Sequence, residues 1–276
     1  MQVFIDTLYI SGTMASVEFV KGCSMDLHFK GKRALVSGGS RGIGLAICKA
    51  LVAGGARVAT CARGQETLDA SLAELGSNAI GNAFDVRDNA AFAGWVEESA
   101  AALGGIDIIV SNVSTRIDPA SATWWQDSFT VDLMQHIRFK QLALPHLARG
   151  SDPAMVFIAS IASVMTTLPP YEEAYGAMKA GLVNLVGQWA AMHGPKGIRV
   201  NAVSPGPIDF EGGWWDTIKQ SNPEGYARAG KMAALGRFGR PEEVAAAVAF
   251  LASPVASFIT GTNLRIDGGL VKTSNF

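Results

Sequence analysis

The sequence predicts an α/β fold, a doubly wound sheet of seven parallel strands with helices on both faces. Short apolar stretches typical of buried strands alternate with longer amphipathic stretches typical of helices from Lys32 onward. One of these strands, in ALVSGGSRGIG (34–44), passes through a glycine turn directly into a helix. Hydrophobic residues make up 49% of the chain and charged residues 17%, which is enough apolar material for a sheet covered on both faces.

The alternation gives each element in order. We expect strands at 33–37, 57–61, 78–84, 106–111, 154–159, 199–203 and 263–266. Amphipathic stretches between them predict helices at 44–53, 66–75, 90–103, 124–147, 174–192 and 241–251. Sheets of this kind bind ligands at the carboxyl ends of their strands, and the motifs described below fall at such ends.

We expect a single domain over residues 25–276, because α/β domains with one sheet reach this length. Residues 1–24 lack the pattern of a signal peptide, and we expect them to be an N-terminal extension that comes from an upstream start codon or from cloning. No apolar run reaches the roughly 20 residues that cross a bilayer, and the net charge of −1 argues against a nucleic-acid partner. Cys23, Cys48 and Cys61 have no metal-ligand spacing and are expected as reduced thiols in a cytoplasmic protein.

The glycine turn predicts a nucleotide site. Gly38 permits a tight turn, Gly42 lets the backbone approach phosphates, and Gly44 allows the helix to pack closely on the strand. The turn also brings backbone N–H groups and the positive end of the helix dipole to one spot, which suits a diphosphate. Glycine turns also occur where they have only a structural role. The strand before this turn and the helix after it are what indicate a dinucleotide site.

Two arginines indicate which nucleotide is bound. No acidic residue ends the second strand, where one would bind the ribose hydroxyls of NAD; Arg63 follows the strand instead, and Arg41 projects from the glycine turn. Two guanidinium groups favour the 2′-phosphate of NADP(H), unless both are ordinary solvated residues. Asp85 closes the third strand, where it would accept a hydrogen bond from the adenine amine or cap a helix.

A tyrosine and a lysine form a candidate acid–base pair. Tyr175 and Lys179 are four residues apart and share one face of a predicted helix. A nearby ammonium stabilises the phenolate and lowers the pKa of the tyrosine toward neutrality, although this spacing also arises by chance. Ser160 ends the fifth strand and could hold a substrate oxygen; Ser163 is the competing candidate, and a turn role is the alternative for either.

The order of the glycine turn, Asp85, Ser160 and the Tyr175/Lys179 pair resembles the short-chain dehydrogenase/reductase family, in particular its 3-oxoacyl-acyl-carrier-protein reductases. GIRVNAVSPGPI (197–208), RFGRPEEVAAAVAFLAS (237–253) and ITGTNLRIDGG (259–269) extend the resemblance. It implies a Rossmann-fold, NADP(H)-dependent oxidoreductase that forms a homotetramer or homodimer, with Ser160, Tyr175 and Lys179 catalytic. The cofactor residues it implies are Ser37, Gly38, Ser40, Arg41, Gly42, Ile43, Gly44, Arg63, Asp85, Val86, Asn112, Tyr175, Lys179, Pro205, Gly206 and Ile208.

The sequence departs from the family pattern at three places. The usual Asn-Asn-Ala-Gly after the fourth strand is Ser111-Asn112-Val113-Ser114 here. Asp132 stands where the family has a catalytic-site asparagine, so we expect it to hold the proton-carrying water while its charge strengthens the ammonium form of Lys179. Phe210 replaces a threonine after the Pro-Gly stretch and places an aromatic ring at the mouth of the site.

The segment over residues 207–235 resembles the mobile substrate lid of the family. It carries large apolar side chains, of which Phe210, Trp214 and Trp215 are expected to contact substrate. An apolar ketone is favoured, such as a 3-oxoacyl thioester, a sterol-like or xenobiotic ketone, or a 3-oxoacyl homoserine lactone. Arg138 and Lys196 match basic residues of the acyl-carrier-protein reductases, or they are a solvated face.

The function expected from these features is NADPH-dependent reduction of a ketone to a secondary alcohol, with Tyr175 as general acid. Two alternatives stay open: an alcohol dehydrogenase acting in the oxidative direction, and a cofactor-binding sensor or scaffold without turnover.

Overall fold

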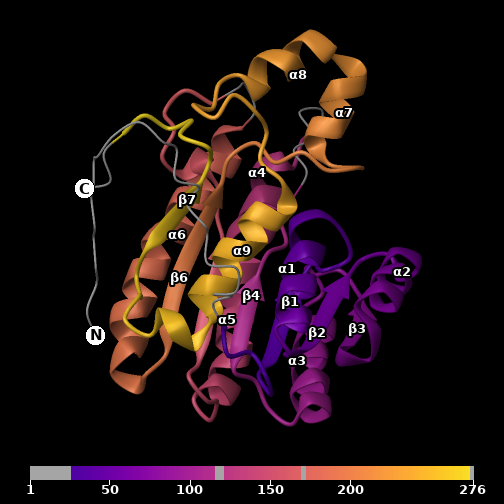
Figure 1. Cartoon of the computed structure of the whole chain (residues 1–276), viewed down its shortest axis with the longest axis vertical. Coiled ribbons are helices and arrows are strands. Elements are labelled where there is room, and N and C mark those ends of the chain that lie inside the picture. The colour runs from indigo at the N-terminus through magenta and orange to yellow at the C-terminus, as the bar shows by residue number, and fades with distance from the viewer. Residues whose placement is uncertain (1–25, 116–120, 169–171, 274–276) are drawn as a thin grey trace, which may run out of the picture.

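A computed structural model describes residues 26–115, 121–168 and 172–273, and the predicted extension over residues 1–24 lies outside them. Seven parallel strands form one sheet in the order β3-β2-β1-β4-β5-β6-β7 (Figure 1), which confirms the predicted fold class. The strands are β1 Arg33–Ser37, β2 Arg57–Ala62, β3 Ala79–Ala83, β4 Ile108–Ser111, β5 Ala154–Ile158, β6 Arg199–Pro205 and β7 Asn263–Ile266. The strand order reverses between β1 and β4, where Ser37 pairs with Ser111, so the ligand crevice is expected there.

Helices cover both faces of the sheet. The helices α1 (Gly42–Ala53) and α9 (Pro241–Ala252) pack together on one face, and α3 (Asn89–Leu103), α5 (Gln135–Leu147) and α6 (Glu173–His193) cover the other. The remaining early helix, α2 (Gln65–Leu75), packs beside β2 and β3. The five inner strands β2, β1, β4, β5 and β6 are largely apolar and buried, as a sheet with two covered faces requires, whereas the edge strands β3 and β7 are partly exposed. No helix in the part of the chain that the structure describes is long and apolar enough to cross a membrane.

The prediction of a single continuous α-helix over 124–147 is wrong, because a π-helical stretch interrupts it. The chain forms α4 (Trp124–Ser128), then a π-helical stretch, η2 (Phe129–Met134), and only then α5. A π-helical turn holds an extra residue, so it changes the direction in which the following side chains point, and it is frequent at functional sites. Here it contains Asp132, whose side chain is fully buried.

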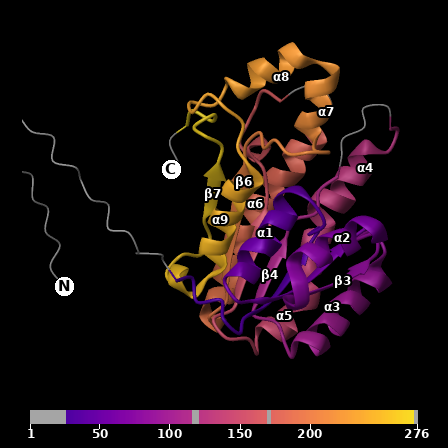
Figure 2. The same cartoon turned by 45° about the vertical axis from the view of Figure 1, so that its right-hand side comes forward.

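Two helices of the predicted lid were not expected from the sequence. The helices α7 (Trp214–Ser221) and α8 (Pro223–Gly230) lie at the same end of the molecule as α4 in both views (Figures 1 and 2). Each has only 8 residues, too few turns for a clear periodic signal. Asn222 separates them, and its side chain accepts a hydrogen bond from the Gly225 N–H to cap α8.

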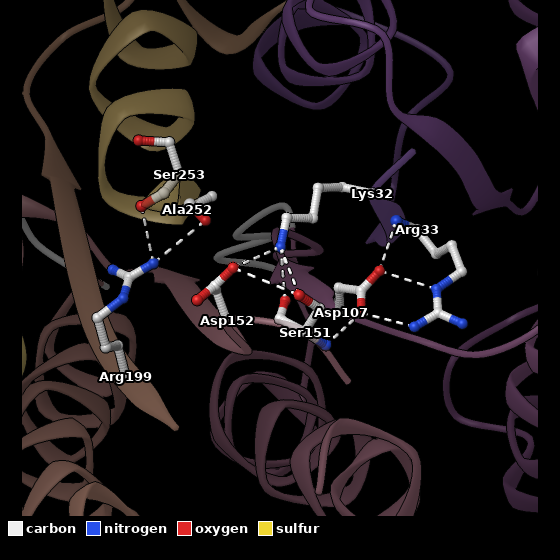
Figure 3. A network of polar contacts seen from close by, with 8 residues as sticks. All are labelled: Lys32, Arg33, Asp107, Ser151, Asp152, Arg199, Ala252 and Ser253. Atoms are coloured by element: carbon white, nitrogen blue, oxygen red, sulfur yellow. Dashed lines mark hydrogen bonds and ion pairs between the residues drawn. The ribbon is translucent and has the colours of Figure 1, made fainter. Parts of the chain in front are cut away.

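A polar network ties together the amino ends of the central strands, opposite the expected site (Figure 3). The Asp107 carboxylate precedes β4 and accepts hydrogen bonds from Arg33 Nε (2.8 Å), Arg33 Nη2 (2.7 Å) and the Ser151 N–H (2.7 Å). Lys32 is paired with Asp152 at 2.9 Å, and Arg199 donates to three carbonyls at the end of α9. This end of the sheet is therefore fixed independently of any ligand.

Candidate active site

A cavity of about 400 Å³ lies at the carboxyl ends of β1, β2 and β4. Nine of the predicted cofactor residues line it: Gly38, Ser40, Arg41, Ile43, Gly44, Arg63, Asp85, Val86 and Asn112. These residues come from the glycine turn and from the segments after β2, β3 and β4, which are far apart in the sequence. The topology therefore brings together the residues that the sequence singled out separately.

The glycine turn has the shape of a phosphate cradle. Gly38 and Gly42 have φ of +76° and +51°, a region that favours glycine, and a Cβ on Gly44 would lie 1.9 Å from the Gly38 carbonyl oxygen. Arg41, at the N-cap of α1, gives the helix no side-chain cap, so the first-turn N–H groups remain donors for an anion. These features fit the diphosphate of a dinucleotide.

Three arginines lie around this cavity, one more than the sequence indicated. Arg87 lines it and pairs with Asp85, its Nη2 lying 2.6 Å from Oδ2, and this hydrogen bond lowers the pKa of the Asp85 carboxyl, with a smaller effect from the Arg63 charge. Arg63 is exposed, and Arg41 donates to the carbonyl of Gly212 in the lid at 3.0 Å. Helix α3 is capped by Asp88, which accepts from two N–H groups, so the alternative that Asp85 is a helix cap is wrong.

Some predicted cofactor residues lie outside the cavity. Ser37 is fully buried and its hydroxyl accepts a hydrogen bond from the Asn112 N–H at 3.0 Å, which ties the ends of β1 and β4 together. A Cβ on Gly206 would meet Asp267, and Ile208 is buried and bridges to Gly239. Neither these two nor Pro205 lines the cavity.

The predicted acid–base pair lies at the start of α6, where Tyr175 is half-buried and Lys179 is buried. The Lys179 side chain is 1% exposed, and its Nζ lies 5.6 Å from the centre of the Tyr175 ring. Nζ also lies 3.1 Å from the Ile158 carbonyl oxygen, 3.5 Å from His136 Nε2 and 3.6 Å from Asp132 Oδ1. Burial lowers the pKa of Lys179, and the charge of Asp132 opposes this effect.

Asp132 lies between Lys179 and the cavity, and Ser114 connects it to the cavity wall. Ser114 was not predicted as a site residue. Ser114 lines the cavity and donates its hydroxyl to Asp132 Oδ1 at 2.5 Å, while the Thr115 N–H lies 3.3 Å from the same oxygen. Burial raises the pKa of the Asp132 carboxyl, although Lys179 and Ser114 lower it. The other oxygen, Oδ2, is buried and has no hydrogen-bond partner among the described residues, so it can accept a proton or a water molecule.

The surroundings of Tyr175 distinguish the two candidate serines. Burial and the charge of Asp132 raise the pKa of the Tyr175 phenol above its usual value, and hydrogen bonds with the hydroxyls of Ser160 and Ser114 offset only part of this rise. The predicted lowering of this pKa toward neutrality is therefore wrong for this structure. Ser163, by contrast, has a buried hydroxyl with no partner in the described part of the chain. Of the two serines, Ser160 therefore interacts with Tyr175, and its hydroxyl also accepts a hydrogen bond from the Ala162 N–H, so the turn role expected as the alternative is present as well.

The lid approaches the cavity through one aromatic residue. Phe210 lines the cavity and lies so close to the glycine turn that a Cβ on Gly42 would be 2.5 Å from its ring. Trp215 packs on Phe238 with ring centres 5.0 Å apart, and Trp214 is 45% exposed. Of the three predicted substrate residues, only Phe210 lines the cavity in this structure.

Comparison with known proteins shows the family to which this chain belongs. A family model described as "Enoyl-(Acyl carrier protein) reductase" matches residues 38–271. The chain belongs to the short-chain dehydrogenase/reductase family. Family members are oxidoreductases that use a nicotinamide cofactor on small-molecule substrates, and the cradle described above fits such a cofactor.

Known family members resemble this chain over most of its length. The isoepoxydon dehydrogenase patN of Penicillium expansum is 37% identical over 248 residues, covering 87% of this chain and 95% of that protein. The 3-oxoacyl-[acyl-carrier-protein] reductase FabG of Escherichia coli K12 is 33% identical over 250 residues, covering 88% and 99%. A solved short-chain oxidoreductase of Pseudomonas aeruginosa PAO1, described as containing an atypical catalytic center, has a TM-score of 0.79, 31% identity and coverage of 88% and 98%.

Proposed function

We propose that this short-chain dehydrogenase/reductase uses NADPH to reduce a ketone to a secondary alcohol. The observation that carries the proposal is the position of Ser114, which lines the cavity, donates to Asp132 and interacts with Tyr175. It makes the proposed cofactor site and the buried acid–base cluster one continuous site.

The chemistry follows from the residues around Tyr175. Bound NADPH supplies the hydride that reduces the carbonyl carbon. Tyr175 donates its phenolic proton to the carbonyl oxygen, so no full negative charge accumulates there. Ser160 holds that oxygen by a hydrogen bond, and the ammonium of Lys179 stabilises the phenolate that Tyr175 becomes.

Asp132 acts through Lys179 in this proposal. Its carboxylate favours the charged lysine, which favours the phenolate, but its own charge also disfavours the phenolate directly. These two effects have opposite signs at Tyr175, and while Lys179 stays charged the direct effect, which raises the pKa of the phenol, is the one that changes with Asp132. Asp132 therefore sets the pH range of the reaction more than its maximal rate.

The cofactor preference rests on the charges at the end of β2. Ala62 ends this strand and Arg63 follows it, so no carboxylate is placed there to bind ribose hydroxyls. Asp85, which follows the neighbouring strand β3 and lines the cavity, is paired with Arg87. Arg41 and Arg63 therefore support a phosphate, and hence NADP(H), at this position.

The substrate class rests on the lid over residues 207–235, whose apolar Phe210 faces the cavity. We favour an apolar ketone or a 3-oxoacyl thioester, the second by analogy with FabG. Arg138 is half-buried and lies 3.5 Å from the Val86 carbonyl oxygen, which leaves Lys196 as the more accessible of the two predicted carrier-protein contacts. A single domain, a homotetramer or homodimer and a cytoplasmic location belong to the same proposal.

A second candidate function is oxidation of a secondary alcohol, which the name of the patN relative favours. It needs no different residues, because Tyr175 would then accept the proton that it otherwise donates. A cofactor-binding sensor would also retain the cradle but would show no turnover in either direction.

The test is the loss of NADPH absorbance with a series of 3-oxoacyl thioesters and apolar ketones, with NADH in parallel. The proposal predicts turnover with NADPH that is faster than with NADH. Oxidation of the matching secondary alcohols with NADP⁺ in the absence of any ketone reduction would favour the dehydrogenase instead. Cofactor binding without turnover in either direction would overturn both enzyme assignments.

A further inference from the structure

A fully buried histidine lies behind the catalytic cluster and has no part in the chemistry described so far. His136 belongs to the first turn of α5 and is 0% exposed. Its Nδ1 lies 2.7 Å from the hydroxyl oxygen of Ser111, the last residue of β4, and its Nε2 lies 3.5 Å from Lys179 Nζ. The ring also meets Phe157 of β5 edge-on, with ring centres 6.2 Å apart.

The partners of His136 determine its tautomer. A lysine ammonium donates hydrogen bonds and cannot accept them, so Nε2 must be the accepting nitrogen of the ring. Nδ1 then carries the proton and donates it to Ser111 Oγ. Burial and the Lys179 charge hold the pKa of His136 well below its usual value, so the ring is neutral at physiological pH.

Three acceptors of the protein surround the Lys179 ammonium. Its three N–H groups face the Ile158 carbonyl, His136 Nε2 and Asp132 Oδ1, which come from β5, α5 and η2. An ammonium this deeply buried is costly unless it is fully hydrogen-bonded. His136 is the only uncharged side chain of the three acceptors, so it holds the ammonium without adding a negative charge beside Tyr175.

We propose that His136, held by Ser111, is a positioning residue that fixes the ammonium of Lys179 under the Tyr175 ring. This proposal rests on the proposed function for its kinetic consequence and on the structure alone for the contact. Among ionisable groups the His136 ring contacts Lys179 of α6, whereas Asp132 of η2 and Tyr175 of α6 contact that lysine. The contacts of the ring on β4 and β5, Ser111 and Phe157, carry no charge.

The kinetic test compares two substitutions of similar size. His136→Gln keeps an acceptor toward Lys179, whereas His136→Leu removes it. Because a hydrogen bond to a charged group contributes strongly, we expect His136→Leu to lower kcat/KM for ketone reduction about ten- to a hundredfold, mostly through kcat, and to move the pH profile. We expect His136→Gln to restore the rate and the profile of the unmodified enzyme.

Another buried histidine provides the control. His193, at the end of α6, is 2% exposed, and its two ring nitrogens have no hydrogen-bond partner in the described part of the chain. His193→Leu removes a buried imidazole of the same size, and we expect it to leave kcat and the pH profile unchanged. Equal losses in His136→Gln and His136→Leu, or no loss in either, would overturn the proposal.

A second measurement needs no turnover. Nitrogen NMR of the histidine side chains, assigned with His136→Gln, is expected to show a neutral ring with the proton on Nδ1, and Lys179→Met is expected to shift the Nε2 resonance. A proton on Nε2, or an Nε2 signal unaffected by Lys179→Met, would refute the contact whatever the enzyme reduces. The expected spectra combined with absent ketone reduction would refute the proposed function and the kinetic role, while confirming the contact.

Discussion

Asp132→Asn removes one negative charge from the catalytic cluster and leaves an amide of nearly the same shape. Asp132 Oδ1 lies 3.6 Å from Lys179 Nζ, and at an effective dielectric constant of about 20 this separation corresponds to an interaction of about 5 kcal/mol. The amide oxygen can keep the hydrogen bonds from Ser114 and Thr115, so the environment relaxes and only part of this energy is lost. Single charges at this range typically move a pKa by about one to three units.

The direction of the effect follows from the two groups that Asp132 influences. Its charge raises the pKa of Lys179 and also that of Tyr175, so both pKa values fall when the charge is removed. Tyr175 then loses its proton at lower pH and stops acting as a general acid sooner. We therefore expect the alkaline limb of the kcat/KM profile for ketone reduction to move down by about one to three pH units, while the variant stays active at neutral pH.

The assay is the initial rate of ketone-dependent NADPH consumption as a function of pH. Asp69→Asn is the matched control, because Asp69 is an exposed residue of α2 whose carboxylate accepts a hydrogen bond from Gln65, far along the chain from the catalytic cluster. It makes the same change in net charge away from the site. An alkaline limb that stays where it is in Asp132→Asn would refute the reasoning, because it would show that this charge does not reach the reacting groups.

Three further predictions follow from single contacts. Arg63→Ala is expected to weaken NADPH binding about tenfold or more while leaving NADH binding unchanged, as calorimetry would show; equal losses for both cofactors would contradict a phosphate contact. Ser114→Ala is expected to lower kcat about tenfold with unchanged NADPH affinity, and Ser114→Thr to restore it; kinetics unchanged by the loss of the hydroxyl would remove Ser114 from the site. Asp107→Asn is expected to lower the free energy of unfolding at neutral pH by about 3 kcal/mol, measured in urea. Burial opposes ionisation of Asp107, but hydrogen bonds from Arg33 and Ser151 outweigh it and hold the pKa of this carboxyl below its usual value. The stabilisation by the ionised Asp107 is therefore present above the ordinary aspartate pKa and is lost as the pH falls through the folded-state value. An Asp107→Asn variant with the same acid unfolding curve as the unmodified chain would contradict this prediction.

The strand pattern and the glycine turn were predictable because each depends on local sequence. Apolar runs with intervening amphipathic segments determine a parallel sheet, and the topology of such a sheet brings Gly38, Arg63 and Asn112 to one cavity even though they are distant in the chain. The same logic failed for Ser37, because sequence position does not tell whether a hydroxyl at a strand end faces a ligand or, as here, the neighbouring strand.

The buried cluster could be predicted only in part. Tyr175 and Lys179 share a helix, so their spacing was enough to pair them. Asp132, His136 and Ser114 come from other segments, and the π-helical turn over Phe129–Met134 changes which side chains of that helix point inward. No periodicity of the sequence signals such a turn, so the contact of Lys179 with His136 emerges only from the three-dimensional structure. The interaction of Asp132 with Lys179 was expected, but from the resemblance to the family and not from any pattern in the sequence.

The most direct test of the central claim is a comparison of Tyr175→Phe with the unmodified chain. Ketone-dependent NADPH consumption would be measured for both proteins, together with NADPH affinity. We expect Tyr175→Phe to bind NADPH and to reduce ketones at least about a hundredfold more slowly, because only the proton donor is missing. A variant that reduces the same ketone at the rate of the unmodified chain would contradict Tyr175 as the general acid and the mechanism built on it.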